Sequence, residues 1–180
     1  MKKLTALTLA FTMTFVLTGC ITDGQSDKPV VSTGNPSGAK SETAVLEQPP
    51  VLTVVSDEIS VTALLGPYSW QRKNVDGTFT AVEADSLHPL DCRDLLSPLL
   101  ETSETTAMLK FAEDPDRIAS IQCWSDSNWS NPSAKGEDVL HNGNTIEVNS
   151  DGHIYEVVAQ WDTDSGYGGT AHYSFYITAE

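Results

Sequence analysis

The chain has 180 residues, and its 25 acidic and 10 basic side chains give a formal net charge of −15 at pH 7. All of this excess lies in residues 50–180, which carry 21 acidic and six basic residues. Nucleic-acid binding requires a basic surface, so a nucleic-acid partner is excluded. Cations, basic peptides and neutral glycans are compatible with such a charge, as is a simple role in the solubility of an exported domain.

The N-terminus has the pattern of an export signal. Lys2 and Lys3 precede the apolar run 4–17, and small residues then lead to Cys20. The run is shorter than the about 18 residues that a membrane span requires. The sequence Leu-Thr-Gly-Cys resembles a bacterial lipobox, which implies cleavage after residue 19 and attachment of acyl chains, such as palmitate, to Cys20. The alternative is an ordinary secretory signal with a chance cysteine.

The next segment has the composition of a tether. Residues 20–49 are poor in large apolar side chains and rich in Gly, Pro, Ser and Thr, so we expect a flexible linker. This linker contains a Ser-x-x-Lys motif at Ser37–Lys40, which resembles the nucleophile pattern of penicillin-recognising enzymes. A flexible segment offers no rigid surroundings to activate such a serine, so we assign it no catalytic role.

Residues 50–180 are long enough to form one domain with a core. Alternation of apolar and polar residues between turn signals predicts a series of short strands. The predicted strands are 51–55, 59–65, 78–82, 107–111, 118–124, 145–148, 153–161 and 170–178, and 68–72 is a candidate for one more. The stretch 85–105 does not follow this alternation, and we predict a loop there with a short helical turn at 91–96.

The last two predicted strands carry the clearest alternation. Each has one apolar row that can be buried: Tyr155, Val157, Ala159 and Trp161 on the first, and Ala171, Tyr173, Phe175 and Ile177 on the second. The side chains between them are expected to face outward: Glu156, Gln160, His172, Ser174 and Thr178. The pairing of these rows predicts the centre of the core.

The number and spacing of the strands predict an all-β protein, an immunoglobulin-like β-sandwich of about seven or eight antiparallel strands. The segment 151–157 resembles the tyrosine corner of that fold, with Tyr155 as the tyrosine. Val157 occupies the place of the second cysteine in antibody domains. The alternative for this segment is a chance Asp-Gly turn before a strand.

Five segments resemble a group of small, uncharacterised lipoproteins of Firmicutes. The segments are 66–70, 85–90, 123–126, 155–161 and 167–171. The resemblance implies an accessory domain that faces the cell envelope, and it implies no established activity.

Two cysteines remain besides Cys20. In an exported protein Cys92 and Cys123 invite a disulfide bond, although Cys123 lies in a predicted strand where a buried free thiol would fit equally well. Both interpretations stay open.

Sequence signatures of catalysis are absent. The chain has neither a Gly-x-Ser-x-Gly elbow nor a His-Glu-x-x-His motif, and its four scattered histidines suggest no zinc site. We therefore expect no catalytic residues. Asp162 and Asp164 alternate with polar residues before Gly166, an oxygen-rich pattern compatible with calcium, although a solvated hairpin turn is the simpler explanation.

The loop 125–133 is the best candidate for a ligand site. It is polar except for Trp129, with Asp126 and Asn128 close by in the sequence. An exposed aromatic ring flanked by a carboxylate and an amide suits sugar or peptide recognition. The alternative is that Trp129 folds back and covers the end of the sandwich.

Together these patterns predict a protein held at the extracytoplasmic face of the cell membrane by its lipid. Its expected role is non-catalytic binding of an envelope protein or a cell-wall glycan. A passive acidic spacer and a wall-acting enzyme with an unrecognised site are the alternatives.

Overall fold

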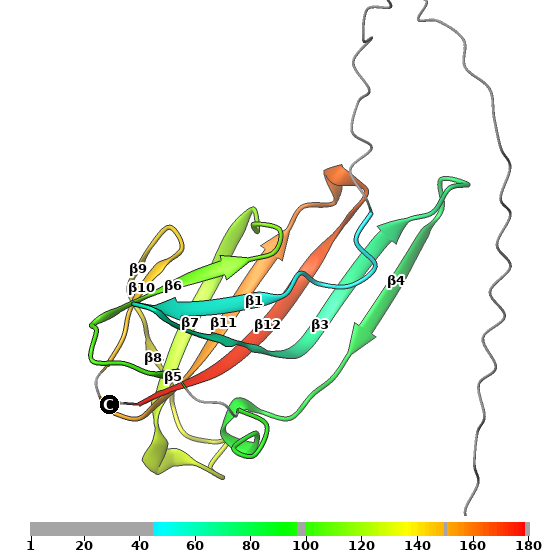
Figure 1. Ribbon diagram of the computed structural model, residues 1–180. Helices are drawn as coiled ribbons and strands as arrows, with labels where there is room; N and C mark the ends of the chain where they lie inside the picture. The colour runs from blue at the N-terminus through cyan, green and yellow to red at the C-terminus, as the bar shows by residue number, and fades with distance from the viewer. Residues whose placement is uncertain (1–44, 97–99, 150, 179–180) are drawn as a thin grey trace, which may run out of the picture. The chain divides into compact units, whose positions relative to one another are not determined.

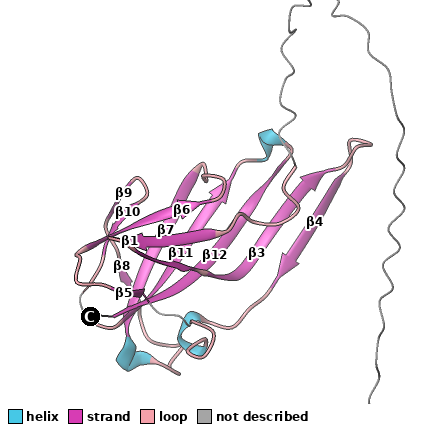
Figure 2. Cartoon of the chain, viewed as in Figure 1, coloured by secondary structure: helices cyan, strands magenta, loops and turns pink. Residues whose placement is uncertain are grey.

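The computed structural model describes residues 45–96, 100–149 and 151–178, so Cys20 and the Ser37–Lys40 motif lie outside the described residues. The described chain consists of strands and three short 3-10 helices (Figure 2). None of the helices in these ranges is long and apolar enough to cross a membrane.

The strands form two sheets (Figure 1). The five-stranded sheet has the order β2-β1-β6-β10-β9, and its strands are β1 (Leu52–Ser56), β2 (Ile59–Thr62), β6 (Thr106–Phe111), β9 (His141–Asn142) and β10 (Thr145–Glu147). The seven-stranded sheet has the order β4-β3-β12-β11-β7-β8, with β5 beside β12. Its strands are β3 (Leu64–Lys73), β4 (Phe79–Ala84), β5 (Leu100–Glu101), β7 (Arg117–Ser125), β8 (Glu137–Asp138), β11 (His153–Trp161) and β12 (Tyr167–Thr178).

One apolar core joins the two sheets. It includes Leu52, Val54 and Leu109 from the five-stranded sheet and the inward rows of β11 and β12 from the other. Neighbouring strands pair antiparallel, apart from the parallel pair β5–β12. The protein is thus an all-β sandwich, as the sequence predicts.

The two rows predicted for the core are confirmed. All eight side chains are buried, and the register places Tyr155 opposite Phe175, with their rings stacked at a centroid distance of 5.2 Å. Period-two alternation sends these residues to one face of the sheet. Ser174, predicted to face outward, is only 4% exposed because Leu95 and Leu96 pack on that side of β12.

The boundary between β2 and β3 differs from the prediction. The sequence suggests a strand 59–65 and a separate strand from Tyr68, whereas β2 ends at Thr62 and β3 runs from Leu64 through Pro67. The register with β12 shifts between Ala171 and Tyr173, so Gly66 and Pro67 together lie opposite one residue. Proline lacks the N–H that a strand ladder needs, and this bulge accommodates it.

The helical turn in 85–105 begins earlier than predicted, although the predicted segment 91–96 contains turn bonds from the N–H groups of Leu95 and Leu96 to the Cys92 carbonyl. The first 3-10 helix, η1, spans Pro89–Asp91, and the Nδ1 atom of His88 accepts a hydrogen bond from the Leu90 N–H at 3.2 Å. This cap, with proline at the first helical position, starts the turn before Asp91.

The sandwich also includes residues assigned above to the linker. Pro49 is buried, and Leu46 packs against the core. The indole N–H of Trp70 donates to the Leu46 carbonyl at 3.1 Å, and the Tyr173 hydroxyl donates to the Pro50 carbonyl at 2.7 Å. Ordered packing therefore begins before residue 50, at the end of the sandwich that carries Trp161.

Candidate functional site

The outer face of the seven-stranded sheet carries a second apolar cluster. Cys123 and Tyr155 point into the main core, so their neighbours Trp124 and Ile154 point outward from the opposite face. Leu90, Cys92 and Leu96 cover them, and Leu64, Trp129, Ala134 and Tyr176 pack around the margin. We name the covering segments, residues 88–96 and 126–136, the outer cap.

Backbone and aromatic contacts hold the outer cap together. The N–H of Ser130 donates to the Leu90 carbonyl at 2.9 Å, which joins its two segments. The indole N–H of Trp124 donates to the Ala134 carbonyl at 3.1 Å, and the His88 ring lies edge-on to Trp124 at 5.4 Å. Ser130 has a φ of 64°, a left-handed conformation that costs about 1–3 kcal/mol in a non-glycine residue. The hydrogen bond and the backbone conformation of Ser130 therefore fix the position of the chain directly after Trp129.

Four side chains gather at the margin of the outer cap, and we refer to them as the Trp129 cluster. Trp129 and Tyr176 lie edge-to-face at a centroid distance of 5.6 Å. The guanidinium carbon of Arg93 lies 5.9 Å from the centre of the Trp129 ring, and the Tyr176 hydroxyl donates to Asp126 Oδ2 at 3.0 Å. Aromatic surface, a cation and a carboxylate are thus adjacent.

Electrostatics and close packing both favour this arrangement. Burial raises the pKa of the Tyr176 hydroxyl, and the hydrogen bond to Asp126 raises it further, so the tyrosine remains the proton donor at neutral pH. Gly152 lies directly against the pair: a Cβ atom there would collide with the Asp126 carboxylate and would come within 2.6 Å of the Tyr176 hydroxyl. The glycine therefore permits the contact.

The structure brings together part of the site predicted from the sequence. Trp129 and Asp126 both belong to the cluster, whereas the Asn128 amide is used to hold the Ser125 carbonyl at 3.3 Å within the turn formed by η2 (Asp126–Asn128). Trp129 is partly buried, intermediate between a free platform and a core residue. Arg93 and Tyr176 cannot be predicted as part of this site from the sequence, because they come from distant segments that only the fold brings to the loop.

The predicted disulfide between Cys92 and Cys123 is not formed, and both residues are buried free thiols. Cys123 lies in the core between the sheets and Cys92 lies in the outer cap, so the seven-stranded sheet separates them. Burial raises the pKa of both thiols, with a smaller contribution from Asp91 at Cys92 and from Glu137 at Cys123. The alternative of a buried thiol in a strand describes Cys123 correctly.

Asp162 and Asp164, the calcium candidates, are both exposed at the turn between β11 and β12. The Asp162 backbone N–H donates to the Asp116 carboxylate at 2.6 Å, and Asp164 lies in η3 (Thr163–Ser165). In the described ranges, no group of three or more His, Cys, Asp and Glu side chains is arranged to hold a metal ion. Calcium binding stays a prediction.

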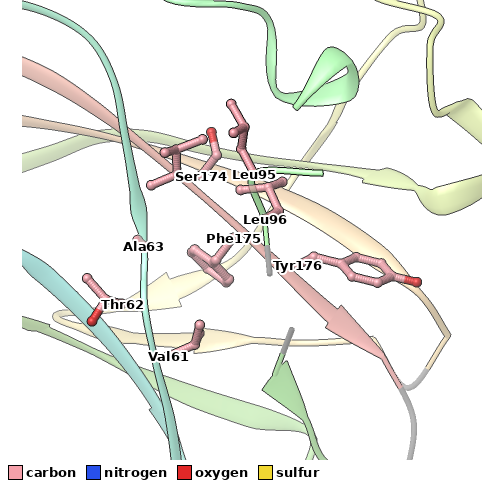
Figure 3. A pocket seen from close by; sticks show the side chains of 9 residues that line it. Val61, Thr62, Ala63, Leu95, Leu96, Ser174, Phe175 and Tyr176 are labelled. Carbon is pink, nitrogen blue, oxygen red and sulfur yellow. The ribbon is translucent and has the colours of Figure 1, made fainter. Parts of the chain in front are cut away.

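A cavity of about 170 Å³ lies beside the outer cap (Figure 3). Its walls are mostly apolar: Val61, Ala63, Leu64, Leu95, Leu96 and Phe175, with Thr62, Ser174 and Tyr176 as the polar members. These side chains carry no charge at neutral pH, so the cavity offers no charged side chain to a ligand. The Trp129 cluster, which combines charge with aromatic surface, is the better candidate.

Comparisons of the chain with protein-family models, with curated proteins and with solved structures find no match.

Proposed function

We propose that this protein is a lipid-anchored, extracytoplasmic binding module, and that the Trp129 cluster binds a neutral cell-wall glycan. The observation that carries the proposal is the juxtaposition of Trp129, Tyr176, Arg93 and Asp126 at one margin of the sheet. The anchor and location are proposed from the lipobox-like sequence that ends at Cys20.

The chemistry of the cluster suits a sugar ring. The partly exposed rings of Trp129 and Tyr176 offer apolar surface for the C–H face of a pyranose, while Asp126 accepts and Arg93 donates hydrogen bonds at the margin. The net charge of −15 disfavours anionic wall polymers, because binding them would bring like charges together.

We also assign the sandwich to the immunoglobulin-like class. Two sheets packed around one core support this assignment, as does a feature of Tyr155. The Tyr155 hydroxyl accepts a hydrogen bond from the backbone N–H of Asn149 at 2.9 Å, the type of upstream contact that defines a tyrosine corner.

Retention of the purified protein on insoluble cell-wall material tests the glycan proposal. Asp126→Asn keeps the shape of the side chain and removes its charge, and Trp129→Ala removes the aromatic surface. We expect each variant to lose at least tenfold in affinity, since an aromatic anchor or a charged hydrogen bond dominates such contacts. Leu140→Ala is the control, because Leu140 is 71% exposed and lies outside the cluster.

Equal retention of the wild type and both cluster variants would show that the Trp129 cluster is not the binding site. Retention by an envelope protein in place of the glycan would favour the other partner class, and turnover of wall material would favour an enzyme. If neither wall material nor an envelope protein retains the protein, a passive acidic spacer becomes the better description.

A further inference from the structure

The edge strands of the two sheets differ in length. The described order of strands ends at four strands, β2 and β9 in one sheet and β4 and β8 in the other, with the two-residue β5 beside β12, and an exposed edge strand can pair with another chain. β8 and β9 have two residues each and β2 has four, so these edges offer little backbone for pairing. β4 has six residues and is the longest of the four.

β4 also lacks several of the devices that usually block an edge. Its sequence, Phe-Thr-Ala-Val-Glu-Ala, contains neither lysine nor proline, and its register with β3 is regular from Phe79 to Ala84. Phe79 is 53% exposed and Val82 is 43% exposed, so apolar surface accompanies the free backbone edge. A regular, apolar edge of this length favours addition of a strand.

The turn before β4 is well ordered by its own side chains. The Asn74 amide donates to the Thr78 and Thr80 hydroxyls at 2.8 and 3.0 Å, and the Asp76 carboxylate accepts from the Thr78 hydroxyl at 2.6 Å. The bonds from Thr78 hold the pKa of Asp76 below its usual value. The edge is therefore preorganised, which reduces the entropy lost when a partner strand pairs with it.

A cavity of about 230 Å³ lies at the end of β4, between β3, β4 and β12. It is lined by Glu83 and Asp85, by His172 and Tyr68, and by small or polar neighbours. Glu83 lies in β4 and Asp85 directly follows it, so an added strand beside β4 would place its side chains next to these two carboxylates, which favour a lysine or arginine.

We propose that the β4 edge binds an extended, basic segment of a partner polypeptide as an additional antiparallel or parallel strand. Backbone hydrogen bonds supply affinity, and the Glu83 and Asp85 carboxylates select a basic side chain. A second copy of this chain is disfavoured as the occupant, because two domains of charge −15 repel each other. The proposal does not rest on the Trp129 cluster, so either can fail alone.

The test uses the soluble form of the whole mature chain, with Cys20 replaced by serine, and a seven-residue peptide of alternating valine and lysine with blocked ends. Hydrogen exchange of backbone amides, followed by NMR, reports strand pairing directly. We expect saturating peptide to slow exchange of outward-facing β4 amides at least tenfold. A matched peptide with glutamate in place of lysine should bind at least tenfold more weakly.

Two variants localise the effect. Val82→Lys places a charge on the edge and should weaken peptide binding at least tenfold. Val75→Lys adds the same charge in the same hairpin, but its side chain is fully exposed in the turn and lies outside β4, so binding should be unchanged.

Unchanged exchange in β4 with the lysine peptide overturns the proposal, and equal affinity for the glutamate peptide overturns its charge selectivity. Sedimentation velocity without peptide provides the remaining check. A dimer that Val82→Lys dissociates would identify a second copy as the occupant and overturn the proposed basic partner.

Discussion

Two tyrosine hydroxyls in the core show how single residues determine the stability of this fold. The Tyr155 hydroxyl accepts from the Asn149 N–H, and the Tyr173 hydroxyl donates to the Pro50 carbonyl. Both residues are almost fully buried, and burial favours the neutral form. It raises the pKa of Tyr155 to about 12 and raises the pKa of Tyr173 as well. The fold therefore depends on both phenols remaining protonated.

This dependence predicts a loss of stability in alkali. The pKa of Tyr155 is higher in the folded chain than in the unfolded chain, so its contribution is complete below about pH 10 and falls as the pH rises toward 12. At pH 11 the free energy of unfolding should be lower by about 1.4 kcal/mol from this residue alone. Urea denaturation at pH 8 and pH 11 measures the difference.

Tyr155→Phe provides the control. It should cost about 1 kcal/mol at pH 8, because the Asn149 N–H loses its partner, and it should lose less further stability between pH 8 and pH 11 than the wild type. An identical pH dependence in both proteins would show that Tyr155 is not responsible.

At the scale of elements, the start of β12 depends on backbone approach that only glycine permits. Gly168 and Gly169 have φ values of 159° and 149°, and Gly169 pairs with Trp70 of β3. A Cβ atom on Gly169 would collide with the Ser69 carbonyl. The sequence predicts this strand only from Thr170, because glycines are poor strand formers, whereas close packing here makes them part of it.

Gly169→Ala should therefore separate β12 from β3 and cost at least 3 kcal/mol, measured by thermal or urea denaturation. Gly77→Ala is the matched control: its φ is 86°, but a Cβ atom there would meet nothing within 4 Å. The control should cost only the backbone strain of about 1–2 kcal/mol. If both variants lost the same unfolding free energy, the collision of the new Cβ atom with the Ser69 carbonyl would contribute nothing to the loss.

The elements also show which features can be inferred from sequence and which cannot. Alternation is local, so the buried rows of β11 and β12 follow directly from the order of residues. The bulge that accepts Pro67 and the packing of Leu46 against the core depend on partners far along the chain. The Trp129 cluster can be predicted only in part: the polar loop indicates Trp129 and Asp126, but nothing in the sequence indicates Arg93 or Tyr176.

Over the whole sandwich, the described chain enters at one end and the proposed glycan site lies at the other. Leu46 is held by Trp70 near Trp161, at the end of β11, whereas Asp126 and Tyr176 lie beside the start of β11. The nine residues of β11 separate the two ends by roughly 30 Å at the usual rise of a strand. This polarity suits a module that is anchored through its N-terminus and binds its ligand at the far end.

The proposed anchor is tested by Cys20→Ala. Two or more acyl chains give stable membrane attachment, so the wild type should partition into the detergent phase and the variant into the aqueous phase. Immunoblotting of the fractions measures the shift, and Ser37→Ala serves as a control for substitutions in the same region. Quantitative recovery of the Cys20→Ala variant with the membrane would contradict lipidation at this residue.

The entry of the chain through β1 has a mechanical consequence. β1 lies between β2 and β6, and the hydrogen bonds of antiparallel pairs run perpendicular to the strands. A pull on the N-terminus along β1, resisted by a ligand held at the opposite end, would load these bonds together in shear instead of opening them one at a time. If the proposed anchor and the proposed ligand hold the two ends, tension between them would act on the hydrogen bonds of β1 in parallel.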